Sequence, residues 1–174
     1  MFKSLHNGLS KVISEAKVDS LLINVWCFIN IKLISFVGVR ILNADENSVV
    51  VRLKLNRRTK NHLNSMYMGA QVIGAEIGPV FYAIKYCELN SLPVNSEYKD
   101  VSADFKRKTK GKYVYFKCED TRKIKETLDV CASSTERAYE KIKVGAYDDK
   151  KMTEKSLVSE FEFTATFRQR RSRH

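Results

Sequence analysis

Residues 69–89 read GAQVIGAEIGPVFYAIKYCEL, and this stretch decides the fold. As a helix it would be about 30 Å long at about 1.5 Å per residue. Apolar residues lie on nearly every side of it, and its only charged residues are Glu76, Lys85 and Glu88. A helix that is apolar nearly all round is buried rather than placed on a surface. The sequence therefore predicts a long central helix that other elements must cover.

Small residues form a stripe along this helix, because Ala70, Gly74 and Gly78 recur every four positions. Each glycine costs about 1 kcal/mol relative to alanine in a helix, so a backbone or side chain is expected to approach closely there. A sheet wrapped round the helix is one candidate. Pro79 should kink the helix. The kink either widens a pocket beside Glu76 or is a packing bend without functional content.

Strand patterns occur on both sides of the central helix. Two runs rich in valine, leucine and isoleucine, 36–43 and 48–55, are separated by a turn-like stretch and predict a β-hairpin. Alternation returns at 98–106 and 112–119, with Gly111 supplying a turn between them. The clearest period of two is at 157–168, which predicts a strand in the middle of the sheet.

Helical spacing marks the remaining segments. Residues 4–34 are predicted to be helical, and 122–142 to form a surface helix with one apolar face inward. The order of elements predicts an α+β fold. In this fold a curved antiparallel sheet of five or six strands wraps around the long central helix, with additional N-terminal and surface helices.

The length of the chain and the scarcity of glycine and proline predict one domain. The chain has 174 residues with only seven glycines and two prolines, and no linker or internal repeat divides it. We therefore expect a single domain over 1–174. Within it lie an N-terminal helical segment at 1–35, the central helix at 69–89 and a basic tail at 169–174.

Residues 21–39 are the only stretch that resembles a membrane span. Asn24, Asn30 and Lys32 interrupt it, and a lysine at the centre of a span costs about 2.5 to 3.5 kcal/mol. We therefore predict that 21–39 belongs to the protein core. Residues 1–9 lack the apolar run of a signal peptide, which favours a cytoplasmic protein.

Cysteines and histidines are too scattered for metal or redox motifs. The four cysteines have no close spacing and are predicted to be buried free thiols in a reducing cytoplasm; they are Cys27, Cys87, Cys118 and Cys131. Three histidines do not form a metal site, so no metal is expected. There is no glycine-rich phosphate loop, no Gly-x-Ser-x-Gly elbow and no His-Glu-x-x-His.

The formal net charge is +11, and basic residues cluster at 57–60, 106–112 and 168–173. Such a surface attracts polyanions. The candidates are nucleic acid and the phosphates of a nucleotide-bearing cofactor such as coenzyme A, and each single cluster also fits plain solvated surface.

The start of the central helix is the candidate for chemistry. A helix N-terminus presents unpaired N–H groups and a positive dipole, which suit a carbonyl oxygen that acquires negative charge. Gly69 would let a substrate come close, and Glu76 lies two turns further on the same face. Burial would raise the Glu76 pKa and make it a general base. Equally, Glu76 could face water or pair with a lysine or arginine. Asn61 and His62 by pattern fit helix capping or a solvated loop.

Residues 57–70, RRTKNHLNSMYMGA, with Glu76 beyond them, resemble the loop and central helix of hot-dog-fold proteins. The likeness is greatest to the DUF4442 group, which is related to PaaI-type thioesterases. The Asn24-Val25-Trp26 stretch and residues 101–105, VSADF, also resemble that branch, so the likeness covers roughly 24–168.

The resemblance implies an acyl-thioester site. In PaaI-type enzymes a loop asparagine, a His-Gly-Gly turn and an acid on the central helix bind the thioester carbonyl and activate water. Asn61 matches the asparagine, Gly69 the second glycine and Glu76 the acid, which makes these three the candidate catalytic residues. The candidate substrate-binding residues are Tyr67, Met68, His62, Arg57 and Arg58, with the arginines near the cofactor phosphates.

The sequence departs from the family pattern at the histidine. Met66 or Tyr67 stands there, depending on the alignment, and Met68 replaces or adjoins the first glycine. A tyrosine hydroxyl could orient a carbonyl, whereas methionine cannot. The first hypothesis is therefore an acyl-CoA or related acyl-thioester hydrolase, and the second is a non-catalytic protein that binds acyl chains or acyl-CoA.

Cofactors and partners follow from the resemblance. Coenzyme A is expected only as part of the substrate, with no covalently bound cofactor, and an acyl-carrier thioester is the other possible substrate. The family also implies a homodimer or a dimer of dimers. A nucleic-acid-binding module is the third and weakest hypothesis, because Tyr113 and Tyr115 are the only aromatic pair near a basic cluster.

Overall fold

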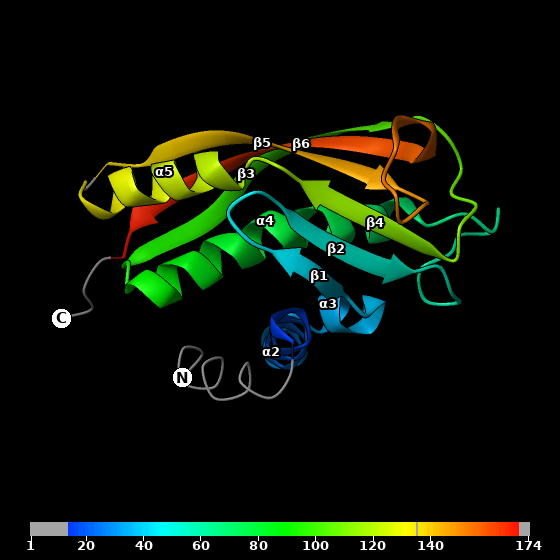
Figure 1. Cartoon of the computed structure of the whole chain (residues 1–174), viewed down its shortest axis with the longest axis horizontal. Coiled ribbons are helices and arrows are strands. Elements are labelled where there is room, and N and C mark those ends of the chain that lie inside the picture. The colour runs from blue at the N-terminus through cyan, green and yellow to red at the C-terminus, as the bar shows by residue number, and fades with distance from the viewer. Residues whose placement is uncertain (1–13, 135, 171–174) are drawn as a thin grey trace.

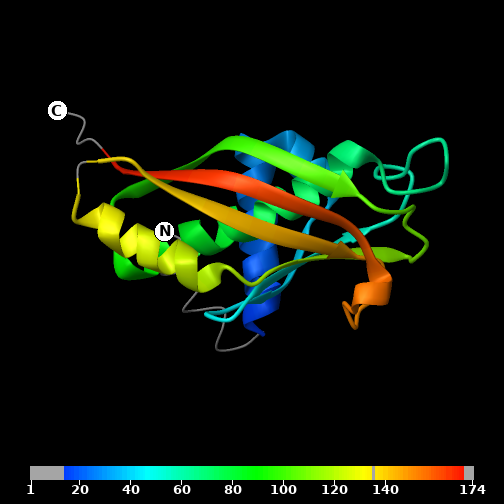
Figure 2. The same cartoon turned by 90° about the horizontal axis from the view of Figure 1, so that it is seen from above.

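The computed structural model describes residues 14–134 and 136–170. Its core is one antiparallel sheet of six strands in the order β1-β2-β4-β5-β6-β3. The sheet curves over the long helix α4, and α5 packs beside the helix at one end (Figures 1 and 2). The strands are β1 (Arg40–Ala44), β2 (Val49–Lys54), β3 (Val94–Phe105), β4 (Tyr113–Cys118), β5 (Ala138–Tyr147) and β6 (Leu157–Gln169).

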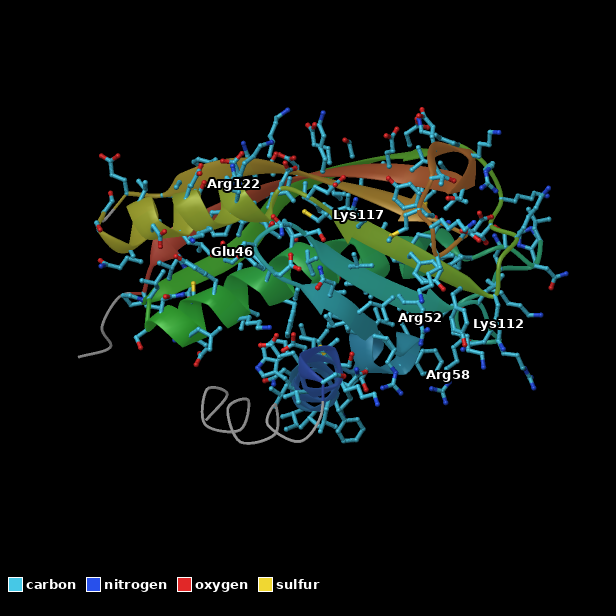
Figure 3. All side chains as sticks on the ribbon, in the orientation of Figure 1. Glu46, Arg52, Arg58, Lys112, Lys117 and Arg122 are labelled. Atoms are coloured by element: carbon cyan, nitrogen blue, oxygen red, sulfur yellow. The ribbon has the colours of Figure 1, made fainter. Side chains whose placement is uncertain are left out.

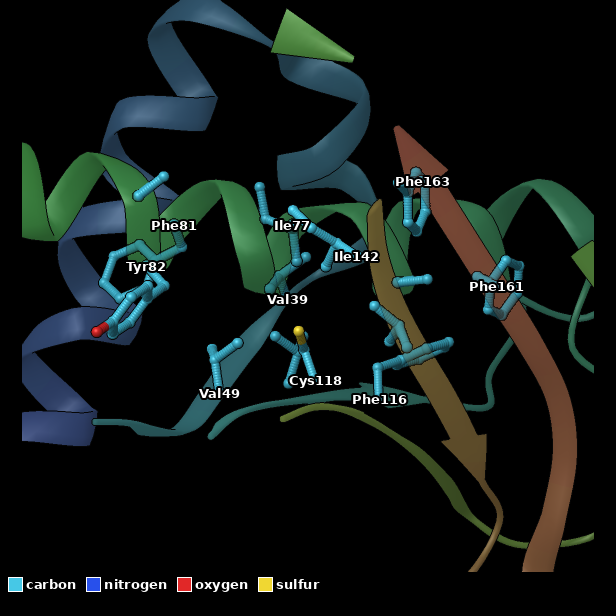
Figure 4. Close-up of a cluster of buried hydrophobic side chains, with 14 of the residues drawn as sticks. Val39, Val49, Ile77, Phe81, Tyr82, Phe116, Cys118, Ile142, Phe161 and Phe163 are labelled. Carbon is cyan, nitrogen blue, oxygen red and sulfur yellow. The ribbon is translucent and has the colours of Figure 1, made fainter. Parts of the chain in front are cut away.

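The central helix is confirmed, because α4 runs from Met68 to Asn90 and contacts all six strands. Ile77 and Phe81 of α4 lie in the buried cluster with Val49 and Phe116 of the sheet (Figure 4). These side chains are at most 3% exposed. The apolar residues on the sheet-facing side of α4 therefore pack against the sheet.

The stripe of small residues on α4 is where the sheet comes closest. A Cβ added to Gly74 would lie 2.3 Å from the ring of Phe116 on β4, and one added to Gly78 would lie 3.2 Å from Val51 on β2. A side chain at position 74 would overlap an aromatic ring that is itself buried. The sheet is thus the element that the stripe was expected to accommodate.

Replacing these two glycines by alanine is expected to give opposite results. Both changes gain about 1 kcal/mol of helix propensity. Gly74→Ala forces Phe116 to move, and overpacking of this kind costs about 1 to 3 kcal/mol. After the gain in helix propensity, this variant should be destabilised by up to about 2 kcal/mol. Gly78→Ala needs a shift of a few tenths of an ångström and should be neutral or slightly stabilising. Urea denaturation of the two variants measures the difference, and equal stability would contradict the close approach at Gly74.

The hairpin of β1 and β2 is confirmed, but its first strand is shorter than predicted. Helix α3 (Lys32–Val37) takes up the beginning of the predicted strand 36–43. Gly38 ends this helix in the left-handed region at φ 77°, and its N–H donates to the carbonyls of Ile34 and Ser35. Both segments are apolar, so composition alone did not separate them.

The predicted surface helix 122–142 is wrong in its second half. Helix α5 spans Thr121–Ala132 and β5 begins at Ala138. In β5 the residues Ile142, Val144 and Ala146 are buried and alternate with more exposed ones. The missed strand pairs with both β4 and β6 and therefore completes the sheet.

The strands at 98–106, 112–119 and 157–168 are confirmed as β3, β4 and β6. The longest, β6, lies inside the sheet between β5 and β3, as predicted. β3 begins earlier than expected, at Val94, and forms one edge of the sheet. Its apolar residues Val101 and Phe105 are 49% and 41% exposed.

The N-terminal segment is helical as predicted, with α2 (Glu15–Asn30) followed by α3. Residues 1–13 and 171–174 lie outside the described residues, so the first part of the segment and most of the basic tail are not placed. Helix α2 crosses α4 on the open side of the sheet (Figures 1 and 2). Ser20 both donates to and accepts from the backbone of Ile41 at 2.9 Å, and Asn24 donates to the Val39 carbonyl at 2.8 Å. Helix α2 therefore provides hydrogen-bond partners for backbone groups of β1, the other edge strand, and of Val39 just before it.

The prediction that 21–39 is core is wrong for most of its residues, because only five of the 19 are buried. Ile23, Cys27, Ile34, Val37 and Val39 are buried. Most of the intervening large apolar residues are exposed, because α2 and α3 form the outermost layer and only one face of each packs against the rest of the protein. Among the described residues, no helix combines the length and hydropathy needed to cross a membrane. All four cysteines are free and buried, as predicted.

Candidate functional site

The loop before α4 is held by a small hydrogen-bond network. The Thr59 hydroxyl donates to the Lys54 carbonyl at 2.6 Å, and the Tyr67 N–H donates to the Thr59 carbonyl at 2.7 Å. Thr109, which follows β3, accepts from the Met66 N–H at 2.7 Å, and its hydroxyl lies 3.1 Å from that of Ser65. Thr59, Ser65 and Thr109 are all buried. The start of α4 is thereby fixed against the sheet.

The predicted site residues in this loop either hydrogen-bond to the loop's own backbone or are exposed to solvent. The side-chain oxygen of Asn61 accepts from the N–H groups of Leu63 and Ser65 at 3.0 and 3.1 Å, so it shapes the turn. His62, Arg57 and Arg58 are exposed. The Arg58 guanidinium lies 5.2 Å from the centre of the Phe36 ring on α3.

The first turn of α4 is accessible from solvent. Tyr67 is the N-cap residue and Met68 the first helical residue, and they are 55% and 56% exposed. The Tyr67 ring lies over Gly69, where an added Cβ would come within 2.6 Å of it. The Tyr67 ring therefore occupies the space that a side chain at position 69 would take. Met66 is 2% exposed, so of the two residues aligned with the family histidine only Tyr67 can meet a ligand.

Glu76 lies in an apolar pocket of about 140 Å³ between α2, α3, α4 and β3. The side chain is partly buried, and burial raises the pKa of its carboxyl group. The other residues that line the pocket are uncharged, and apart from Trp26 and Tyr98 they are all aliphatic. They are Ile23, Trp26, Ile31, Ile34, Ile77, Val80, Ile84 and Tyr98. Of the two readings of Glu76, a water-facing glutamate and a buried one, the structure supports the second.

Two neighbours report on the electrostatics of this pocket. The Tyr98 hydroxyl donates to the main-chain carbonyl of Glu76 at 2.9 Å, in the turn that precedes Pro79. Burial, and secondarily the Glu76 carboxylate, raises the pKa of Tyr98 well above its usual range. The same two causes raise the pKa of the buried Cys27 thiol to about 11. Both groups therefore stay protonated and neutral near pH 7.

The structure divides the predicted site residues into two groups. Asn61, His62, Tyr67, Met68 and Gly69 lie together at the start of α4, with the two arginines at the beginning of the same loop. Glu76 lies further along the helix, and no loop residue is among those that line its pocket. The pocket contacts α4 from residue 76 onward and does not extend to the first turn.

Sequence reasoning missed three residues that build this region. Tyr98 and Trp26 form walls of the pocket. Gln71, in the first turn of α4, is buried, donates to the Met66 carbonyl at 3.1 Å and accepts from the Ser159 hydroxyl at 2.7 Å. The one signal for Gln71 was a polar residue in an otherwise apolar helix. Trp26 belonged to a stretch that resembles the family but was not assigned to the site, and nothing local marked Tyr98.

The arrangement suits acid–base chemistry on an apolar substrate. A carboxyl group with a raised pKa in an apolar pocket can accept a proton from water near neutral pH. Within 14–134 and 136–170, no group of three or more histidine, cysteine, aspartate or glutamate residues could hold a metal ion.

Solved structures with the same architecture reveal what the chain is similar to. A protein of unknown function from Chlorobaculum tepidum superposes with a TM-score of 0.72 at 12% identity, covering 89% of this chain and 97% of that one. A thioesterase from Haemophilus influenzae gives 0.61 at 15% identity, covering 87% and 92%. The chain has the hot-dog fold. A thioesterase family protein from Silicibacter pomeroyi also gives 0.61, at 12% identity over 87% and 99% of the two chains.

These neighbours share the hot-dog fold with this chain. Their sequence identities are too low to transfer the role of any residue to it. No family model matches the sequence, and no curated protein matches it.

Proposed function

We propose that this protein hydrolyses acyl thioesters, with acyl-CoA or an acyl-carrier thioester as substrate, in the cytoplasm. The single observation that carries the proposal is the half-buried Glu76 in an otherwise uncharged pocket on the central helix of a hot-dog fold. The pocket accepts an apolar chain, and the carboxylate activates water beside it. Arg57 and Arg58, both exposed, are placed to meet the phosphates of coenzyme A.

The proposed step is direct attack by water. Glu76 takes a proton from a water molecule, whose oxygen forms a bond to the thioester carbonyl carbon. The oxyanion is stabilised by N–H groups at the start of α4, including that of Gly69. When the carbon–sulfur bond breaks, the thiolate leaves and receives the proton. The products are the carboxylic acid and the free thiol.

The spacing on α4 supports a dimer in this proposal. Seven residues separate Gly69 from Glu76, which is about 10 Å along the helix axis. One carbonyl cannot meet both groups of the same chain, so we propose that Gly69 of one protomer and Glu76 of its partner act together. The edge strand β3, with Val101 and Phe105 partly exposed, is the surface best suited to pairing.

A non-catalytic acyl-binding protein is the second candidate. It is favoured by the replacement of the family histidine, because Met66 is buried and the Tyr67 ring covers Gly69. Such a protein would bind acyl-CoA in the same pocket and release no thiol.

A panel of acyl-CoAs with a thiol-detecting dye tests the proposal. We expect thiol release above the uncatalysed rate in the wild type and in Glu88→Gln, which changes an exposed carboxylate on the same helix. Glu76→Gln should lose it. Light scattering on the same sample should show a dimer or tetramer. Binding of acyl-CoA by calorimetry without any thiol release would instead establish the second candidate.

A further inference from the structure

The outer surface of α2 and α3 is a large exposed apolar patch. On α2 the spacing of its residues places them on one face, opposite the buried Ile23 and Cys27. Monomeric proteins rarely expose contiguous apolar patches of this kind, which usually mark an interaction site. The patch comprises Leu21, Val25, Phe28, Ile29, Leu33 and Phe36, which are between 51% and 70% exposed.

Positive charge borders this patch. Lys32 and Arg40 are exposed on the segment itself, and Arg58 projects beside α3, where it stacks on Phe36 (Figure 3). Neither the stretch 20–44 nor the loop 56–67 contains an aspartate or glutamate. The stretches 20–44 and 56–67 are therefore apolar and cationic. The two carboxylates of α2 lie before this stretch, Glu15 in the first turn and Asp19 buried against Lys85.

This combination decides between two possible occupants. A second copy of the chain, docked through a two-fold axis, would set the patch against itself and bring the basic residues of both copies together without compensating charge. An anionic lipid surface satisfies both features, because the acyl region accepts the apolar side chains and the headgroups attract the cations.

We propose that α2 and α3 dock the protein on the surface of an anionic membrane. The helices lie along the interface, with Phe28 and Ile29 inserted and Lys32, Arg40 and Arg58 at the level of the headgroups. Trp26 and Ile31 are 40% and 43% exposed and also line the Glu76 pocket, so the pocket borders the docked face. An apolar ligand could then pass between lipid and pocket without crossing water.

Trp26 provides a direct readout, because it is the only tryptophan in the chain and lies next to the patch. The full chain is mixed with vesicles of phosphatidylcholine alone, or of phosphatidylcholine and phosphatidylglycerol. We expect flotation and a blue shift of the Trp26 emission with the anionic vesicles only, both weakening as salt rises. Lys32→Gln should weaken binding about fivefold.

A matched pair of variants separates this patch from general hydrophobicity. Ile29→Asp changes a residue that is 70% exposed on α2, and Val130→Asp one that is 67% exposed on α5. Both should fold, since neither side chain is in the core. Ile29→Asp should lower vesicle affinity by more than about tenfold. Val130→Asp should lower it only through its added negative charge, by about as much as Lys32→Gln does.

Three outcomes would overturn the proposal. They are no flotation with anionic vesicles, equal losses in the two aspartate variants, and a wild-type oligomer that Ile29→Asp dissociates without any vesicle binding. The last would assign the patch to a second copy. Hydrolysis of acyl-CoA is measured without vesicles, so failure of docking leaves the proposed hydrolase function untouched.

Discussion

Glu76→Gln is expected to lower the rate of acyl-CoA hydrolysis by about 10² to 10⁴-fold, the usual contribution of a general base. Glutamine has nearly the same shape but cannot take a proton from water. Since burial raises the pKa of Glu76, the wild-type rate should rise with pH as this group ionises, with a midpoint above its ordinary value of 4.5. Single-turnover thiol release across pH measures both effects, and Glu88→Gln should retain the wild-type profile.

The same variant is expected to be more stable than the wild type at pH 7. Desolvation raises the Glu76 pKa in the folded state above its unfolded value. The folded protein then binds this proton more tightly than the unfolded chain does, so the stabilisation is present below about pH 4.5 and is lost as pH rises through the folded-state pKa. At pH 7 the ionised carboxylate is a net cost that glutamine removes.

A pH series of urea unfolding curves checks the sign. The advantage of Glu76→Gln over the wild type should be largest near neutral pH and should shrink toward pH 4. A variant that is inactive and also less stable at pH 7 would show that Glu76 holds the fold together rather than tolerating burial for the sake of chemistry.

The parts of the fold that the sequence revealed are those with a strong local pattern. In α4 the residues are apolar on nearly every side, and in β6 apolar and polar residues alternate. Each pattern persists over many residues, so it fits only one kind of secondary structure. β5 was missed because Tyr139 and Ile142 also continue the helical spacing of α5. Pairing with β4 and β6 decides in favour of the strand, and that pairing joins residues far apart in the chain.

The candidate site was predictable in its residues and not in its arrangement. Glu76 was found because a carboxylate in an apolar helix is conspicuous. Its surroundings depend on Trp26 and Tyr98, which come from α2 and β3. The buried face of α2 carries the polar residues Asp19 and Ser20, whereas its exposed face is apolar, so hydrophobicity could not show which face would stay exposed.

Breaking the ion pair between α2 and α4 is expected to cost the most stability. The Lys85 ammonium lies 2.9 Å from the Asp19 carboxylate, and the two side chains are only 10% and 2% exposed. Asp19→Asn leaves the Lys85 charge buried without its carboxylate, which costs about 3 to 5 kcal/mol. The exposed pair Lys125 and Glu46, at 3.0 Å, is the control. Glu46→Gln should cost at most about 1 kcal/mol.

A double variant distinguishes loss of the pair from loss of packing. Asp19→Leu with Lys85→Met removes both charges and fills the space with apolar atoms, so it should recover most of the stability lost in Asp19→Asn. Because α2 forms one wall of the Glu76 pocket, Asp19→Asn should also shift the Trp26 emission toward that of a water-exposed indole before global unfolding, whereas the double variant should not. If both variants lose stability equally, α2 is held by the shape of its contacts and the ion pair contributes only orientation.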